Sequence, residues 1–93
     1  MTSRENLAML TTVEVLVGND AEVLSRIVRV VSTQPFTLAM LHYWQLPGSD
    51  NCRVLMDVVV DGRSELLSKR LNRLTSVQRV RLLDQYETTK EQR

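Results

Sequence analysis

The stretch Val13–Phe36, VEVLVGNDAEVLSRIVRVVSTQPF, decides how the rest of the chain can fold. It opens with Val13, Val15 and Val17 on alternate positions, the period-2 pattern of a strand with one buried face. The period then changes to that of an amphipathic helix, with apolar residues three and four positions apart at Val23, Leu24, Ile27, Val28 and Val31. A strand followed so closely by a helix must fold back so that the two apolar faces meet.

The corner between this strand and this helix is short and polar. Gly18 tolerates the backbone angles of a sharp turn, and Asn19 can cap the helix. Glu22 stands three residues after Asn19, the spacing of a capping box. Free backbone N–H groups at such a corner point outward, so the pattern predicts a place where an anionic group could bind.

The remaining chain continues the same alternation of strands and helices. Pro47-Gly48 with Ser49-Asp50-Asn51 predicts a hairpin turn. The order strand–helix–strand–strand–helix–strand is the ferredoxin-like α+β arrangement, in which two helices cover one face of a four-stranded antiparallel sheet. We expect one domain over residues 11–84, with flexible termini at 1–10 and 85–93. The predicted strands are residues 11–17, 36–46, 52–60 and 77–83, and the predicted helices are 21–33 and 64–74.

Composition excludes several classes of protein. The 93 residues are 43% hydrophobic and carry a net charge of +1, which gives no reason to expect nucleic acid or a membrane as a partner. No apolar run approaches the roughly 20 residues of a membrane span, and the N-terminus lacks the layout of a signal peptide, so we expect a cytoplasmic protein. Cys52 is the only cysteine, which excludes an internal disulfide and a multi-cysteine metal site.

The two faces of the predicted sheet differ in what they bury. If the even positions of residues 36–46 face the helices, the other face still carries many apolar residues among its charges. An apolar patch on an exposed face is typical of a partner surface, although single surface aliphatics are also common. We therefore predict a partner surface made of Leu16, Ala39, Leu41, Tyr43, Leu55 and Val59.

The sequence contains little that could carry catalysis. In the predicted hairpin His42 is opposite Met56 and Cys52 is opposite Leu46, about 13 Å away along the strands, so the two cannot form a couple or share a metal. The open sheet face also offers no aromatic platform for stacking nucleic acid bases on its central strands. We predict no catalytic residue, no metal site and no cofactor in this chain.

Several segments resemble the ACT domain of the small, regulatory subunits of acetohydroxyacid synthase (acetolactate synthase). The first segment is VLVGNDAEVLSRIVRVVSTQPFTLAML, with Asn19, the triplet Leu24-Ser25-Arg26 and the aromatic Phe36. The second, residues 71–80, is similar to the ending LxKLxDVxxV of that family. The similarity covers residues 11–84, and the chain resembles the short, one-domain type of small subunit.

This resemblance implies a partner and a mode of action. ACT domains of this family pair side by side through edge strands, so a homodimer is implied. The large catalytic subunit holds thiamine diphosphate, magnesium and flavin (FAD), and the small subunit raises its activity. In members that respond to valine, the effector is held at the dimer interface. The positions that correspond to this effector site are Gly18, Asn19, Asp20, Ala21, Glu22, Val23, Thr37 and Leu38.

Two departures from the family pattern bear on effector binding. Many members have Gly where this chain has Glu22, and Asn where it has Thr37. Glu22 adds a side chain and a negative charge where a ligand carboxylate would lie, so we expect weak or absent valine sensitivity. Two alternatives remain open from the sequence. One is a stand-alone amino-acid sensor, and the other is a small ferredoxin-like enzyme or ligand-free dimer module.

Overall fold

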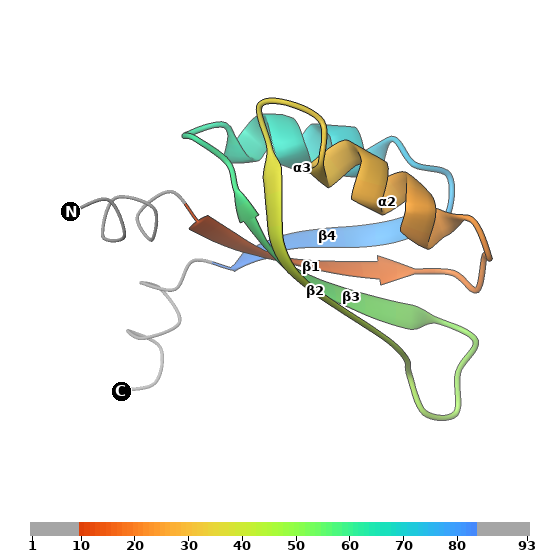
Figure 1. Cartoon of the computed structure of the whole chain (residues 1–93). Helices are drawn as coiled ribbons and strands as arrows, with labels where there is room; N and C mark the ends of the chain where they lie inside the picture. The colour runs from red at the N-terminus through yellow and green to blue at the C-terminus, as the bar shows by residue number, and fades with distance from the viewer. Residues whose placement is uncertain (1–9, 84–93) are drawn as a thin grey trace, which may run out of the picture.

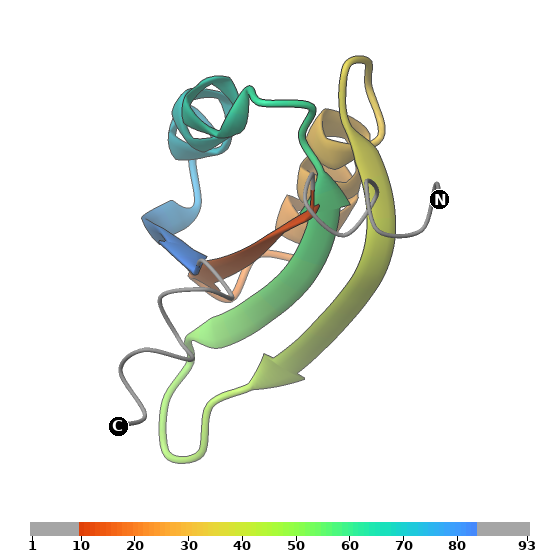
Figure 2. The same ribbon diagram turned by 90° about the vertical axis from the view of Figure 1, so that its left-hand side faces the viewer.

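The computed structural model describes residues 10–83 as a helix layer over a sheet (Figure 1). The two helices lie on one face of a four-stranded sheet, and no other element of residues 10–83 covers the opposite face (Figure 2). The elements in chain order are β1 (Leu10–Val17), α2 (Val23–Val31), β2 (Thr37–Gln45), β3 (Cys52–Val59), α3 (Ser64–Asn72) and β4 (Val77–Leu83). This order confirms the predicted ferredoxin-like arrangement.

The predicted alternation in the first strand builds the centre of the core. Val13, Val15 and Val17 are completely buried under the helices. They meet the apolar stripe of α2, where Ile27 and Val31 are also fully buried. From the other helix and the neighbouring strand the core receives Leu67, Leu71, Val54, Met56 and Val58. A core of this kind holds α2 and α3 against the sheet through removal of apolar surface from water.

The sheet is antiparallel throughout, in the order β2-β3-β1-β4. This order places β1 and β3 in the middle and leaves β2 and β4 as edges. The prediction that β2 is an edge strand is therefore confirmed. An edge strand has backbone N–H and C=O groups that a further strand could pair with.

A bulge in β2 changes which side chains of that strand face the helices, contrary to the prediction. The register with β3 shifts between Leu38 and Met40, so Ala39 is the extra residue. One extra residue moves every later side chain to the opposite face. Leu41 consequently pairs with Met56 and packs against the core, whereas even positions were expected there.

The same shift places Tyr43 on the helix side, opposite Val54, and His42 opposite Leu55. The prediction that the even positions of β2 face the core is thus right for Leu38 and wrong after the bulge. We call the face away from the helices the open face. It is formed by Leu10, Thr12, Glu14, Leu16, Thr37, Met40, His42, Trp44, Arg53, Leu55, Asp57, Val59, Arg79, Arg81 and Leu83.

The ends of the elements agree with the predictions to within two residues. Leu10, expected in the lead-in, is the first residue of β1, and α2 begins at Val23 rather than at residue 21. Of the predicted flexible termini, 1–10 and 85–93, all but Leu10 lie outside the described residues, as does residue 84 of the predicted domain. Neither helix within residues 10–83 is long and apolar enough to cross a membrane.

Candidate functional site

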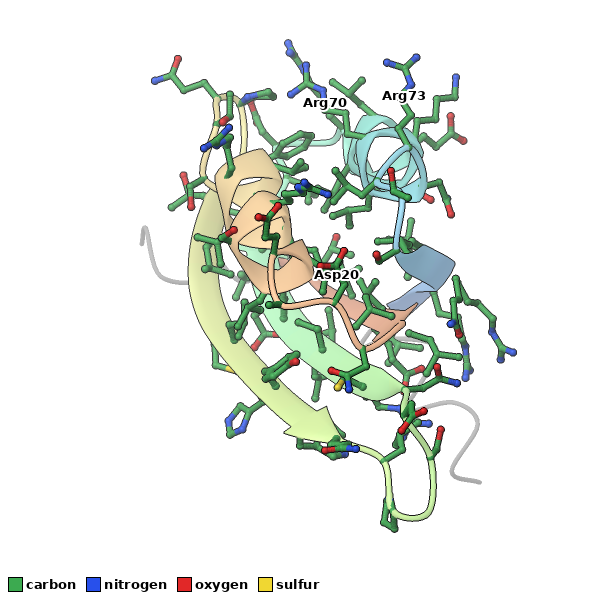
Figure 3. The ribbon with its side chains drawn as sticks, turned by 90° about the vertical axis from the view of Figure 1, so that its right-hand side faces the viewer. Asp20, Arg70 and Arg73 are labelled. Carbon is green, nitrogen blue, oxygen red and sulfur yellow. The ribbon has the colours of Figure 1, made fainter. Side chains whose placement is uncertain are left out.

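The corner between β1 and α2 is organised by Asp20 (Figure 3). One carboxylate oxygen of Asp20 accepts the backbone N–H of Glu22 at 3.0 Å, and the other accepts the hydroxyl of Ser76 at 2.5 Å. The hydrogen bond from Ser76, followed by that from Glu22, lowers the pKa of Asp20. Asp20 therefore provides the carboxylate at the start of α2, the place where an anionic ligand was expected.

The predicted capping box does not form. Glu22 itself occupies the N-cap position, and no side-chain hydrogen bond caps the helix there. Glu22 lies four residues, about one helical turn, before Arg26 and pairs with that guanidinium at 2.7 Å. The Glu22 side chain is 70% exposed, so it points into solvent rather than back toward Asn19.

Other backbone donors of the corner also have partners inside the chain. The N–H of Gly18 donates to the carbonyl of Ser76 at 2.9 Å. The N–H of Asp20 donates to the carbonyl of Gly18 at 2.9 Å, and that of Val23 to the carbonyl of Asp20 at 3.2 Å. A ligand carboxylate that used any of these donors would have to displace an existing hydrogen bond.

The two parts of the predicted effector site lie at opposite ends of α2 (Figure 1). The residues Gly18 to Val23 lead into its first turn, whereas Thr37 and Leu38 begin the strand that follows its last turn. A helix of nine residues is about 13 Å long, so one chain does not bring these two parts together. Thr37 is exposed, and Leu38 packs against the core.

On the open face, three arginines gather around one carboxylate. Arg53 Nε lies 3.0 Å from Glu14 Oε2, and Arg81 Nη1 lies 3.3 Å from Glu14 Oε1. Arg79 is the neighbour of Leu16 across the β1–β4 pair. These five residues line a shallow hollow of about 90 Å³. We call Arg53, Arg79 and Arg81 the arginine cluster. This cluster was not predicted from the sequence. Pairing the predicted strands β1 and β4 would have placed Arg79 and Arg81 near Glu14.

The predicted partner surface is divided between the two faces of the sheet. Leu16, Leu55 and Val59 lie on the open face as expected. Leu41 and Tyr43 lie on the helix side, and Ala39 is the exposed residue of the bulge. Because of the bulge, Met40, His42 and Trp44 lie on the open face instead.

Two large aromatic side chains near the end of β2 are exposed on opposite faces. Trp44 is 39% exposed and pairs with Arg53, while Tyr43 is 41% exposed and pairs with Val54. The Tyr43 hydroxyl donates to the sulfur of the buried Cys52 at 3.4 Å, a contact that raises the pKa of Tyr43. The expected pairing of Cys52 with Leu46 is corrected to a pairing with Gln45, because the N–H of Leu46 donates to the carbonyl of Asn51 at 2.9 Å, so the turn comprises residues 47–50 rather than 47–51.

Comparisons with solved structures identify the fold. The ACT domain of a GTP pyrophosphokinase from Chlorobium tepidum superposes with a TM-score of 0.62 at 16% identity, covering 81% of this chain and 97% of that domain. A solution structure of the same domain gives a TM-score of 0.61 at 16% identity, covering 81% and 85%. The C-terminal domain of the MgtC protein from Mycobacterium tuberculosis gives 0.64 at 21% identity, covering 80% and 84%.

Sequence comparison adds no assignment, since no protein-family model and no curated protein matches the chain. At 16–21% identity the structural likeness establishes the fold alone. Together with the strand order and the two helices on one face, it shows that residues 10–83 have the ferredoxin-like fold of ACT domains.

Proposed function

We propose that this chain is the non-catalytic regulatory subunit of acetohydroxyacid synthase, a cytoplasmic partner of that enzyme in branched-chain amino acid biosynthesis. The proposal is supported by the ACT-type fold and by the resemblance of residues 15–41 and 71–80 to the small subunits of that enzyme. In this proposal the large subunit holds thiamine diphosphate, magnesium and FAD and performs the reaction. Docking of the small subunit favours the active arrangement of the large one.

The described residues give a catalytic role little support. His42 lies on the open face and Cys52 is buried on the helix side, so the sheet separates the two side chains. No group of three His, Cys, Asp or Glu side chains within residues 10–83 could hold a metal ion. Arg53 and Arg81 each pair with Glu14, an arrangement suited to recognition rather than to proton transfer.

The observation that favours docking over amino-acid sensing is the state of the β1–α2 corner. The carboxylate of Asp20 already accepts the N–H of Glu22, the donor that a free amino acid would use. The side chain of Glu22 points into solvent and pairs with Arg26, so it offers no donor to a ligand carboxylate. Regulation through contact with a catalytic subunit needs no ligand in that place, whereas a stand-alone sensor does.

Reconstitution with the large subunit tests the proposal directly. The purified chain with thiamine diphosphate and magnesium should condense no pyruvate, and the chain mixed with the large subunit should raise the rate of that subunit. The matched control is the Val15→Asp variant, which places a charge at a completely buried position and should not fold or activate. If a complex forms and the rate stays unchanged, the assignment is wrong.

The sensor alternative makes a different prediction for the chain alone. Saturable binding of an amino acid, measured by calorimetry without the large subunit, would favour a sensor. A titration of each branched-chain amino acid into the chain, and into the chain with the large subunit, distinguishes the two functions.

A further inference from the structure

The arginine cluster carries more positive charge than its surroundings neutralise. Both oxygens of the Glu14 carboxylate are already engaged, one by Arg53 and the other by Arg81. Arg79 lines the same hollow. Among residues 10–83, one carboxylate beside three guanidinium groups leaves an excess of two positive charges at this end of the open face. Such an excess attracts a carboxylate from outside the chain.

Apolar side chains border the arginine cluster. Leu16 lines the hollow, and Leu55 follows along the centre of the sheet. Trp44 is directly opposite Arg53 on the edge strand and is 39% exposed. Trp and Arg are among the residues enriched in the energetically dominant centre of protein–protein interfaces. A small anion would need the arginines but would gain little from Trp44.

We propose that the open face, centred on the arginine cluster and Trp44, is the surface that docks a carboxylate-bearing patch of the large catalytic subunit. This inference rests on the proposed function and names the surface and the chemistry of the partner. Carboxylates of the partner would pair with Arg79 and with the outer N–H groups of Arg53 and Arg81. An apolar group of the partner would cover Leu16 and Trp44.

Charge argues against a second copy of this chain as the occupant. A second open face brings its own arginine cluster and so adds positive charge to positive charge. The other acid of this face, Asp57, already accepts the Thr12 hydroxyl at 2.7 Å. It is a single carboxylate, fewer than the two positive charges in excess, whereas a different protein surface can supply the number of carboxylates that the cluster lacks.

Two pairs of matched variants test the inference. Arg79→Glu reverses a charge on the open face, and Arg73→Glu makes the same change at the C-cap of α3, in the helix layer (Figure 3). Trp44→Ala removes an aromatic from the open face, and Tyr43→Ala removes its equally exposed neighbour from the helix side. Circular dichroism and sedimentation of each variant alone check folding and oligomeric state.

The affinity of each folded variant for the large subunit is the readout. We expect Arg79→Glu and Trp44→Ala to weaken binding at least tenfold, and the two controls to change it less than about threefold. Binding of the wild-type chain should also weaken as salt is raised.

The outcomes separate this inference from the proposed function. If the wild-type chain binds no large subunit, both are wrong. If it binds and all four variants bind equally well, only the docking surface is wrong. If Arg79→Glu instead dissociates a homodimer of the chain, the open face joins two copies. If it abolishes binding of inorganic phosphate and leaves large-subunit binding unchanged, the cluster is an anion site. Either result overturns the inference.

Discussion

The Ser76 hydroxyl donates a hydrogen bond to the carboxylate of Asp20, a residue 56 positions earlier in the chain. This contact joins the corner before α2 to the connection between α3 and β4. A second contact runs parallel to it, from the N–H of Gly18 to the carbonyl of Ser76 at 2.9 Å. Asp20 therefore links the two halves of the domain at the place where the effector site was predicted.

Asp20→Ala should lower the thermal unfolding midpoint by a few degrees. The substitution leaves the Glu22 N–H and the Ser76 hydroxyl without their acceptor. Ser76→Ala should cost less, because only one of the two hydrogen bonds is lost, and the double variant should be less destabilised than the sum of the two. Asp50→Ala, at an exposed position in the β2–β3 turn, is the control and should leave the midpoint unchanged. An unchanged midpoint for Asp20→Ala would show that the link is unimportant.

The stabilisation from Asp20 should depend on pH in one direction. Its pKa is lowered in the folded chain from an ordinary value of 3.8, so the ionised carboxylate is favoured by folding. The contribution is then present above the unfolded pKa and is lost as the pH falls through the lower, folded value. The difference in midpoint between the wild type and Asp20→Ala should be constant from pH 7 to about pH 5 and should shrink below pH 4. A difference that grows on acidification would contradict this assignment.

The fold was predictable because its signals are local periods. Val13, Val15 and Val17 alternate, and α2 carries its apolar stripe at helical spacing, so the elements and their order could be read directly. The bulge at Ala39 could not be predicted. No Gly or Pro marks it, and β2 has apolar residues at both odd and even positions, so its sequence does not show which face is buried. The bulge is therefore the reason that Leu41 and Tyr43 were both predicted on the open face, although they lie on the helix side.

The hydrogen bonds of the β1–α2 corner could be predicted only in part. The polar residues of the corner indicated a capped helix start, and both Asn19 and Asp20 are suitable caps. The structure distinguishes Asp20 from Asn19 by a long-range hydrogen bond. The hydroxyl of Ser76, 56 residues later in the chain, donates to the carboxylate of Asp20. The arginine cluster was missed for the same reason, because its members come from β3 and β4 and meet only through β1.

The chain should be a homodimer at micromolar concentration, paired through the β2 edge. Edge strands with apolar residues on both faces recruit another strand, and β2 is such an edge. The sequence suggests Leu41→Lys as a test of the dimer. That variant is unsuitable because Leu41 packs against the core, so a charge there would also destabilise the single chain. Ala39→Lys changes an exposed residue of the edge and should shift the sedimentation coefficient toward that of a monomer.

Thr75→Lys is the matched control for the dimer, since it adds the same charge at an exposed position between α3 and β4. It should leave the sedimentation coefficient unchanged. A wild-type chain that sediments as a well-folded monomer at micromolar concentration would rule out the dimer.

Dimerisation matters for any effector because one chain does not complete the predicted site. The corner and the start of β2 are separated by the length of α2, so an amino acid could contact both only if a second chain contributed one of them. Disruption of the β2 edge by Ala39→Lys should therefore abolish any residual effector response along with the dimer.

Valine should inhibit the reconstituted enzyme weakly or not at all. Its carboxylate would have to displace Asp20 from the N–H of Glu22, and it would meet the charge of Glu22 nearby. Loss of the interaction with the helix terminus and repulsion between carboxylates together predict an affinity lower by roughly one to two orders of magnitude than at a corner with free donors. Glu22→Gly with Thr37→Asn should restore some sensitivity, and adding Asp20→Ala should restore more because it frees the donor. The control is Asp50→Ala in the same background, which removes an exposed carboxylate from the β2–β3 turn. Calorimetry that finds micromolar valine binding to the unmodified dimer would contradict this prediction. It would show that the valine carboxylate can replace Asp20 as the acceptor of the Glu22 N–H.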